Sequence, residues 1–257
     1  MRRKLKSLAV ASAAVLAALL SLFPFGVRRA LLSGLLLTES RIGPPSDSLK
    51  RLFRVWNNLD LIINERATAY GDGENPKHRL TGYHDFFVGH IPDASRVLDV
   101  GCGIGAVARS IATSLLDAHV TAIDFDPRML EQARALDNPS NLVFVEGDAA
   151  RDLPAEHWDV VVLSNVLEHM DGRVAFLQGL LSRNTPQCIL IRVPLFERHW
   201  HNPLRKELGV GFFSDPTHRI EHTLAEFEGE MTEAGLEIVE CRTLWGEIWA
   251  RCELATN

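Results

Sequence analysis

The sequence predicts an α/β fold: a doubly wound, mostly parallel sheet of seven strands with a closing antiparallel strand, preceded by additional N-terminal helices. From residue 96 onward, short runs rich in Val, Ile and Leu alternate with helix-like stretches, which is typical of strands joined by crossover helices. The first run, residues 97–100, leads into three glycines at alternate positions, as in a strand–turn–helix unit. Two alternating runs near the C-terminus, 236–244 and 248–254, predict an antiparallel pair.

The chain has 257 residues, enough for one substantial core. We expect three parts: an apolar, basic-flanked segment at 1–45, a helical cap at 46–95, and the α/β domain at 96–257 with an insertion at 194–222. The four cysteines form no C-x-x-C pair, so we expect reduced thiols rather than a disulfide framework or a zinc site.

The N-terminal segment predicts an attachment to a membrane surface through residues 1–40. Residues 7–27 carry no charge, and about 20 apolar residues suffice to span a bilayer. Residues 1–45 hold seven basic side chains against one acidic, whereas the whole chain has a net charge of −6. The acidic remainder argues against nucleic acid as a partner, and the basic head suits anionic lipid. A cleaved signal and a buried helix are the alternatives.

The expected topology is attachment to the cytoplasmic face of a membrane. Basic residues before and after the apolar segment favour an N-terminus inside, and a single span would then place the α/β domain outside. A segment that dips into one leaflet, continued by an interfacial helix over 27–38, avoids this conflict.

The cap is expected to contain two helices, at 49–67 and 76–88. The first has apolar residues at helical spacing, and the second ends at a glycine. Two interpretations of the second helix stay open: it packs through its aromatic residues, or it faces a ligand through His78, Arg79, Tyr83 and His84.

The glycine turn predicts a nucleotide-like ligand. Glycines accept positive φ angles and let a ligand approach the backbone. Their spacing also fits the dinucleotide pattern G-x-G-x-x-G/A. However, Asp99 precedes the turn by two residues, and a carboxylate there suits a cationic ligand better than a pyrophosphate. Asp126 and Pro127 fit the start of a helix, which leaves Asp124 free for the ligand.

Further signals place the remaining elements. Residues 142–145 and 159–163 are the third and fourth strands, followed by helix 171–182, and 187–193 is a strand closed by a proline. Helix 223–234 begins at Thr223 as its N-cap and stops at Gly235.

Four motifs in order, VLDVGCGIG, AIDFDP, VEGDAA and DVVVLSNVLEH, resemble the class I S-adenosylmethionine-dependent methyltransferases. The likeness covers residues 96–252 and is greatest to the small-molecule branch that includes the quinone-biosynthesis enzymes. The resemblance implies a Rossmann-like domain that binds S-adenosylmethionine. The glycines would lie near the methionine part of this ligand, and carboxylates would lie at its amino group, ribose and adenine. The implied binding residues are Asp99, Gly101, Gly103, Gly105, Asp124, Phe125, Asp148, Ala149 and Asn165.

Two histidines are the candidate catalytic residues. His169 follows the fourth strand and has a side chain that titrates near neutrality, so it could act as a general base or make a structural hydrogen bond. His218 lies in the long 194–222 insertion, where we expect it to recognise the acceptor. His218 and His222 with Glu221 or His199 lack a complete metal-ligand spacing, so no metal site is predicted.

The predicted function is methyl transfer from S-adenosylmethionine to a small or lipid-linked acceptor by in-line displacement. A nicotinamide-dependent oxidoreductase shares the glycine turn but leaves Asp148 and the LEH motif unexplained. A non-catalytic partner subunit that binds S-adenosylmethionine is the third possibility.

Overall fold

The computed structural model describes residues 17–153 and 156–255, and the chain divides into two compact units. One consists of Met1–Glu65 with Glu207–Val210, and the other of Arg66–Lys206 with Gly211–Asn257. The expected three-part division stays a prediction.

The first unit contains helix α2 (Phe25–Ser40) and most of helix α3 (Pro45–Tyr70). Arg51 of α3 ties the two helices together through an ion pair with Glu39 and a bond to the Glu39 carbonyl oxygen at 3.1 Å. The expected interfacial helix lies within α2, none of whose residues is buried. Within 17–153 and 156–255, no helix is long and apolar enough to cross a membrane. Much of the apolar segment 7–27 lies outside the described residues.

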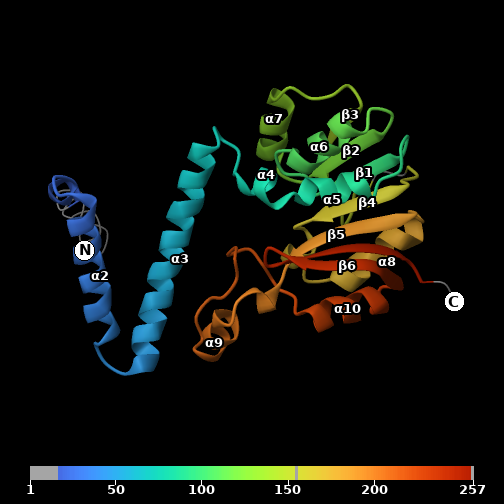
Figure 1. Cartoon of the computed structure of the whole chain (residues 1–257). Coiled ribbons are helices and arrows are strands. Elements are labelled where there is room, and N and C mark those ends of the chain that lie inside the picture. The colour runs from blue at the N-terminus through green and yellow to red at the C-terminus, as the bar shows by residue number, and fades with distance from the viewer. Residues whose placement is uncertain (1–16, 154–155, 256–257) are drawn as a thin grey trace, which may run out of the picture. The chain divides into compact units, whose positions relative to one another are not determined.

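The second unit is built on one seven-stranded sheet, as predicted (Figure 1). The strand order is β3-β2-β1-β4-β5-β7-β6; β1 to β5 are parallel, and β7 is antiparallel to both of its neighbours. Because the order reverses between β1 and β4, a crevice for a ligand is expected beyond their carboxyl ends. The strands are β1 (Arg96–Val100), β2 (His119–Asp124), β3 (Leu142–Glu146), β4 (Val160–Ser164), β5 (Cys188–Pro194), β6 (Leu236–Leu244) and β7 (Glu247–Leu254).

Helices cover both faces of the sheet (Figure 1). Alternate residues of β1 and β4 enter two apolar cores: Leu98 and Val161 join the core that includes residues of α8 and α10, while Val97 and Val160 join the core of α5 and α6. The helices are α4 (Lys77–Thr81), α5 (Tyr83–Gly89), α6 (Ala106–Ser114), α7 (Pro127–Ala135), α8 (Arg173–Arg183), α9 (His201–Glu207) and α10 (Leu224–Glu233), with 3₁₀ turns η1 (Leu167–His169) and η2 (Phe196–Arg198).

Local sequence signals at helix ends agree with the structure, except in the cap. The single helix expected over 76–88 is wrong: Gly82, with φ of 67°, separates α4 from α5. Asp126 caps α7 by accepting a bond from the Arg128 N–H, with proline at the first turn. Thr223 and Glu226 form a reciprocal capping box at the start of α10.

Candidate cofactor and acceptor site

The glycine turn follows β1 at the point where the strand order reverses. Gly101, Gly103 and Gly105 have φ angles of 66°, 54° and 74°, a region that glycine adopts without strain. A Cβ on Gly101 would lie 2.9 Å from a methyl carbon of Val166, and one on Gly105 would lie 2.6 Å from the Phe144 ring. No such atom lies within 4 Å at Gly103. Two glycines thus allow close packing, and the middle one leaves open space beside the backbone.

Asp99, on β1 next to this turn, is a buried carboxylate with one unpaired oxygen. The residue is only 1% exposed, and its Oδ2 has no hydrogen-bond partner among the described residues. Burial raises the pKa of Asp99 to about 7, and the nearby Asp124 carboxylate adds to the increase. A buried carboxylate oxygen without a partner is costly, so the position favours a cationic ligand group that would pair with it.

Asp124, at the end of β2, was expected to be free for a ligand, but its carboxylate already accepts two hydrogen bonds within the protein. Its Oδ2 accepts a bond from the Gly103 N–H at 2.7 Å, and its Oδ1 accepts one from the Asp126 N–H at 2.8 Å. The carboxylate therefore fixes the glycine turn to the second strand. Since each carboxylate oxygen has more than one acceptor position, bonds to a ligand remain available.

The other predicted cofactor residues lie beyond the ends of β2, β3 and β4, at the same edge of the sheet. Phe125 is 75% exposed, and Ala149 is buried. Asp148 accepts a bond from the Ala150 N–H at 3.0 Å. Asn165 has a φ of 59°, and its side-chain oxygen is buried without a partner among the described residues. The structure thus brings the predicted set to one edge, while their contacts with a ligand stay a prediction.

The two candidate catalytic histidines lie against each other, although 48 residues lie between them in the sequence. The rings of His169 in η1 and His218 in the insertion pack edge to face, with centroids 4.7 Å apart. Burial, followed by the nearby His218, lowers the pKa of His169. At neutral pH this imidazole is therefore uncharged and able to accept a proton or a ligand.

Glu168 belongs to the same cluster and was not singled out from the sequence. It is wholly buried, and neither carboxylate oxygen has a hydrogen-bond partner in the described part of the chain. Burial raises its pKa to about 8. Glu168, His169 and His218 each place one possible ligand atom within 4.8 Å of the others. His222 instead contacts Glu230 at 3.0 Å, so it is occupied elsewhere.

Arg192 on β5 is a second charged group that the sequence did not reveal, because it lies inside an apolar run. It donates hydrogen bonds to both oxygens of Glu247, and its guanidinium lies 3.8 Å from the ring centroid of Tyr83. The Tyr83 hydroxyl lies 2.5 Å from His78 Nδ1, and that nitrogen lies 3.2 Å from His84 Nε2. Burial raises the pKa of Tyr83 to about 12. The polar side chains of α4 and α5 thus contact one another and Arg192, and whether they face a ligand stays a prediction.

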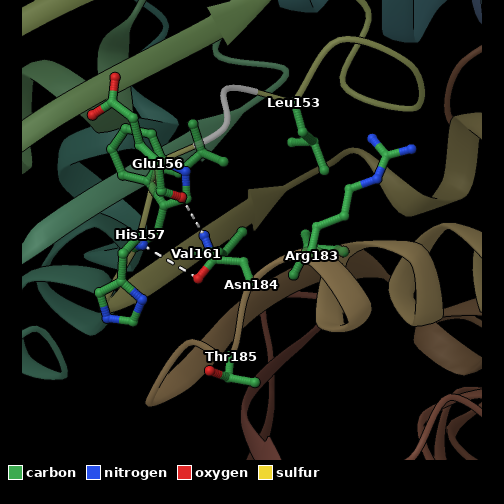
Figure 2. A pocket seen from close by; sticks show the side chains of 10 residues that line it. Leu153, Glu156, His157, Val161, Arg183, Asn184 and Thr185 are labelled. Atoms are coloured by element: carbon green, nitrogen blue, oxygen red, sulfur yellow. Dashed lines mark hydrogen bonds between the residues drawn. The ribbon is translucent and has the colours of Figure 1, made fainter.

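A cavity of about 540 Å³ lies at the opposite edge of the sheet, near the amino ends of β4 and β5 (Figure 2). Asn184 bridges its wall by donating to the Glu156 carbonyl oxygen and accepting from the Trp158 N–H. No predicted site residue lines it. A smaller cavity of about 180 Å³ is lined partly by insertion residues, including Phe196, Phe212 and Glu221.

Comparisons with known proteins agree with this geometry. Residues 97–186 match the model of the methyltransferase domain family. A trans-aconitate 2-methyltransferase of Streptomyces avermitilis is 31% identical over 159 residues, 58% of this chain and 52% of that protein. A 2-methyl-6-phytyl-1,4-hydroquinone methyltransferase of Synechocystis is 26% identical over 252 residues, 86% of this chain and 78% of that protein.

The solved structures show the same fold. An S-adenosylmethionine-dependent methyltransferase from Aquifex aeolicus has a TM-score of 0.56 at 14% identity, over 71% of this chain and 94% of that one. The sheet and the glycine turn agree with the family match over residues 97–186, as expected for a class I S-adenosylmethionine-dependent methyltransferase domain. The resemblance inferred from the motifs is confirmed, and S-adenosylmethionine is the cofactor of this class. The chain spans about half the length of the Streptomyces relative.

Proposed function

We propose that this chain transfers a methyl group from S-adenosylmethionine to a small or lipid-linked acceptor. The observation that carries the proposal is the glycine turn at the reversal of strand order, with the Asp99 carboxylate buried beside it and one of its oxygens without a partner among the described residues. A nicotinamide cofactor would bring a pyrophosphate to that carboxylate, which repels it. The match to the methyltransferase domain family supports the same choice.

The cofactor supplies a methyl group already activated by a positively charged sulfur. Asp99 would pair with the ligand's amino group, while Asp124 would accept bonds from its ribose and hold the glycine turn in shape. Asp148 and Ala149 would contact the adenine. These side chains mainly align the two reactants, because orientation is the largest contribution that a protein can make to a displacement of this kind.

The acceptor would bind beside His169 and His218. The insertion that carries His218 also holds a cavity with aromatic walls, which neither histidine lines. Phe196, Phe212 and Phe213 line the cavity of about 180 Å³ together with Lys206 and Arg219. An aromatic acceptor with polar substituents fits such a lining. The Synechocystis relative is named for a prenylated hydroquinone, and its similarity extends over 86% of this chain.

The test is transfer of labelled methyl from S-adenosylmethionine to a panel of acceptors: prenylated hydroquinones, short phenols and trans-aconitate. Product from at least one of the aromatic acceptors, lost in Asp124→Ala and retained in the exposed Asp117→Ala control, supports the proposal. Binding of S-adenosylmethionine without transfer to any acceptor, by a folded chain, would favour a non-catalytic partner subunit. Transfer to trans-aconitate alone would overturn the choice of an aromatic acceptor.

We infer that the chain attaches to the cytoplasmic face of a membrane through its N-terminal region. Helix α2 supports this, because Leu31, Leu32, Leu35, Leu36 and Leu37 are all exposed beside Arg28 and Arg29. Such a helix is expected to bind anionic vesicles.

Flotation with vesicles, carbonate extraction and protease access in cells test the attachment. The full chain should float, and a Leu31→Ser, Leu35→Ser double variant should float less than the wild type. Full-length protein that stays in the aqueous fraction of cells and vesicles would end this idea.

A further inference from the structure

The buried side chain of Glu168 lacks the partners that a buried acidic group usually has. Its carboxylate is fully buried, and neither oxygen has a hydrogen-bond partner among the described residues. An ionised carboxylate in this state costs several kcal/mol in general, so such a group is paired with a cation, coordinates a metal or takes up a proton. No arginine or lysine forms an ion pair with Glu168 within 17–153 and 156–255; its recorded contact is His218 Nε2 at 4.0 Å.

The hydrogen bonds around His169 determine which ring nitrogen is free. The Thr217 hydroxyl donates to Asp215 Oδ1 at 2.6 Å, so the same oxygen accepts from His169 Nδ1, which lies 2.9 Å away. With its proton on Nδ1, the neutral ring carries its lone pair on Nε2. The side chain is thus prepared to offer Nε2 to a partner.

His218 is held in the same tautomer by a different group. Its Nδ1 lies 3.4 Å from Glu221 Oε1. The Glu221 carboxylate also accepts bonds from Arg198 and from the Ser214 N–H, so it is an acceptor and His218 Nδ1 is the donor. The Nε2 atom of His218 lies 4.0 Å from Glu168 Oε1.

Two imidazoles and one carboxylate thus each place a possible ligand atom within 4.8 Å of the others. Metal-binding histidines usually donate their other ring N–H to a carboxylate or another fixed acceptor, which sets the tautomer and orientation. Glu221 and Thr217 do this for His218 and His169. We propose that Glu168, His169 and His218 bind a divalent first-row transition-metal ion.

The donor set determines the class of ion. Two imidazole nitrogens and one carboxylate oxygen suit Zn²⁺, Co²⁺ or Fe²⁺ better than Mg²⁺ or Ca²⁺, which prefer oxygen ligands alone. Ligand atoms of a tetrahedral zinc site lie about 3.4 Å apart, given bonds of roughly 2.1 Å. The three atoms here lie within 4.8 Å of one another, so binding requires a modest contraction.

The proposed metal site would lie close to the cofactor turn. Glu168 and His169 lie in η1, just beyond β4, and Val166 of the same segment packs against Gly101 of the cofactor turn. His169 is exposed while the other two proposed ligands are buried, so the site would be reached from the His169 side. If the proposed methyl transfer is correct, an acceptor oxygen could occupy a remaining coordination position. This role rests on the proposed function, whereas binding of the ion does not.

The test is titration of the chelator-treated full chain with Co²⁺, followed by its visible absorption, with Zn²⁺ as competitor. We expect one saturating equivalent, displaced by Zn²⁺. Glu168→Gln and His218→Gln should each weaken binding at least about tenfold. Glu221→Gln, which removes the charged acceptor of His218 and also alters the bonds from Arg198 and Ser214, should weaken it by about ten- to hundredfold. His157→Gln removes an exposed imidazole near the opposite edge and should bind as the wild type does.

S-adenosylmethionine binding, measured calorimetrically on the same samples, separates the two proposals. Cofactor binding by a chain that takes up no Co²⁺ would overturn the metal site and leave the proposed function intact. Metal binding without cofactor binding would do the reverse. One equivalent of Co²⁺ that persists in both ligand variants would show adventitious binding and refute the assignment.

Discussion

Asp99→Asn is the most informative single substitution in the cofactor site. The change keeps the size of the side chain and removes its charge. In the absence of a ligand, burial raises the pKa of Asp99 to about 7, so a large part of the molecules carry a proton there at neutral pH. A ligand ammonium group beside the carboxylate would favour the ionised form. Binding should therefore release a proton from Asp99 and strengthen as the pH rises.

The size of the effect follows from this pKa. With a value of about 7, Asp99 is about 9% ionised at pH 6 and 50% ionised at pH 7, so affinity for S-adenosylmethionine should rise about fivefold over that interval. The ligand's own amino group, with an ordinary pKa near 8, stays mostly protonated in this range. Loss of the charged hydrogen bond in Asp99→Asn, worth about 1.5–3 kcal/mol, should weaken binding at pH 7 by roughly ten- to hundredfold.

Isothermal titration calorimetry of the full chain at pH 6 and pH 7, in buffers of different ionisation enthalpy, measures both the affinity and the proton release. Asp99→Asn should show neither the pH dependence nor the buffer dependence. Asp117→Asn, a change at an exposed carboxylate, should behave as the wild type. Equal affinity and equal pH dependence in Asp99→Asn and wild type would refute the pairing of Asp99 with the ligand.

Three further predictions concern stability, measured by urea unfolding. Gly105→Ala should destabilise the fold by about 2 kcal/mol or more, because its Cβ would meet the Phe144 ring at a φ of 74°; Gly229→Ala, inside α10 and with open space around it, should not. Burial alone would raise the pKa of Glu230, but bonds from His222 and Arg173 outweigh it and lower the pKa to about 2. The resulting stabilisation is about 2 kcal/mol after allowance for solvent exposure. It is present above pH 4.5 and is lost as the pH falls toward 2. The difference in free energy of unfolding between Glu230→Gln and wild type should therefore shrink on acidification, and a constant difference would contradict this. Thr223→Ala should cost about 1 kcal/mol and Thr223→Ser much less, since only the alanine removes the capping box of α10.

Much of the fold was predictable because local chemistry and the tertiary structure agree. The glycine turn after residues 97–100, the proline and aspartate that open α7, and the threonine and glutamate that open α10 each specify one geometry. The alternating pattern in 236–254 likewise predicted the antiparallel pair β6–β7. In contrast, Gly82 could either continue a helix or end it, and its neighbours did not decide between the two.

The site was predictable only where residues follow strands in order. The gathering of Asp99, Asp124 and Asn165 was predictable because parallel strands bring their carboxyl ends to one edge, while their contacts with a ligand stay a prediction. Arg192 was missed, since its partner Glu247 is 55 residues away and the surrounding run is apolar. Glu168 was seen only as part of a motif, because its lack of partners is a property of packing that the sequence does not display.

The central claim is that the glycine turn binds S-adenosylmethionine. Calorimetric titration of the full chain with S-adenosylmethionine, S-adenosylhomocysteine and NAD tests it most directly. We predict binding of both sulfur ligands, no binding of NAD, and loss of binding in Asp124→Ala. Binding of NAD alone, or of none of the three by a demonstrably folded chain, would contradict it.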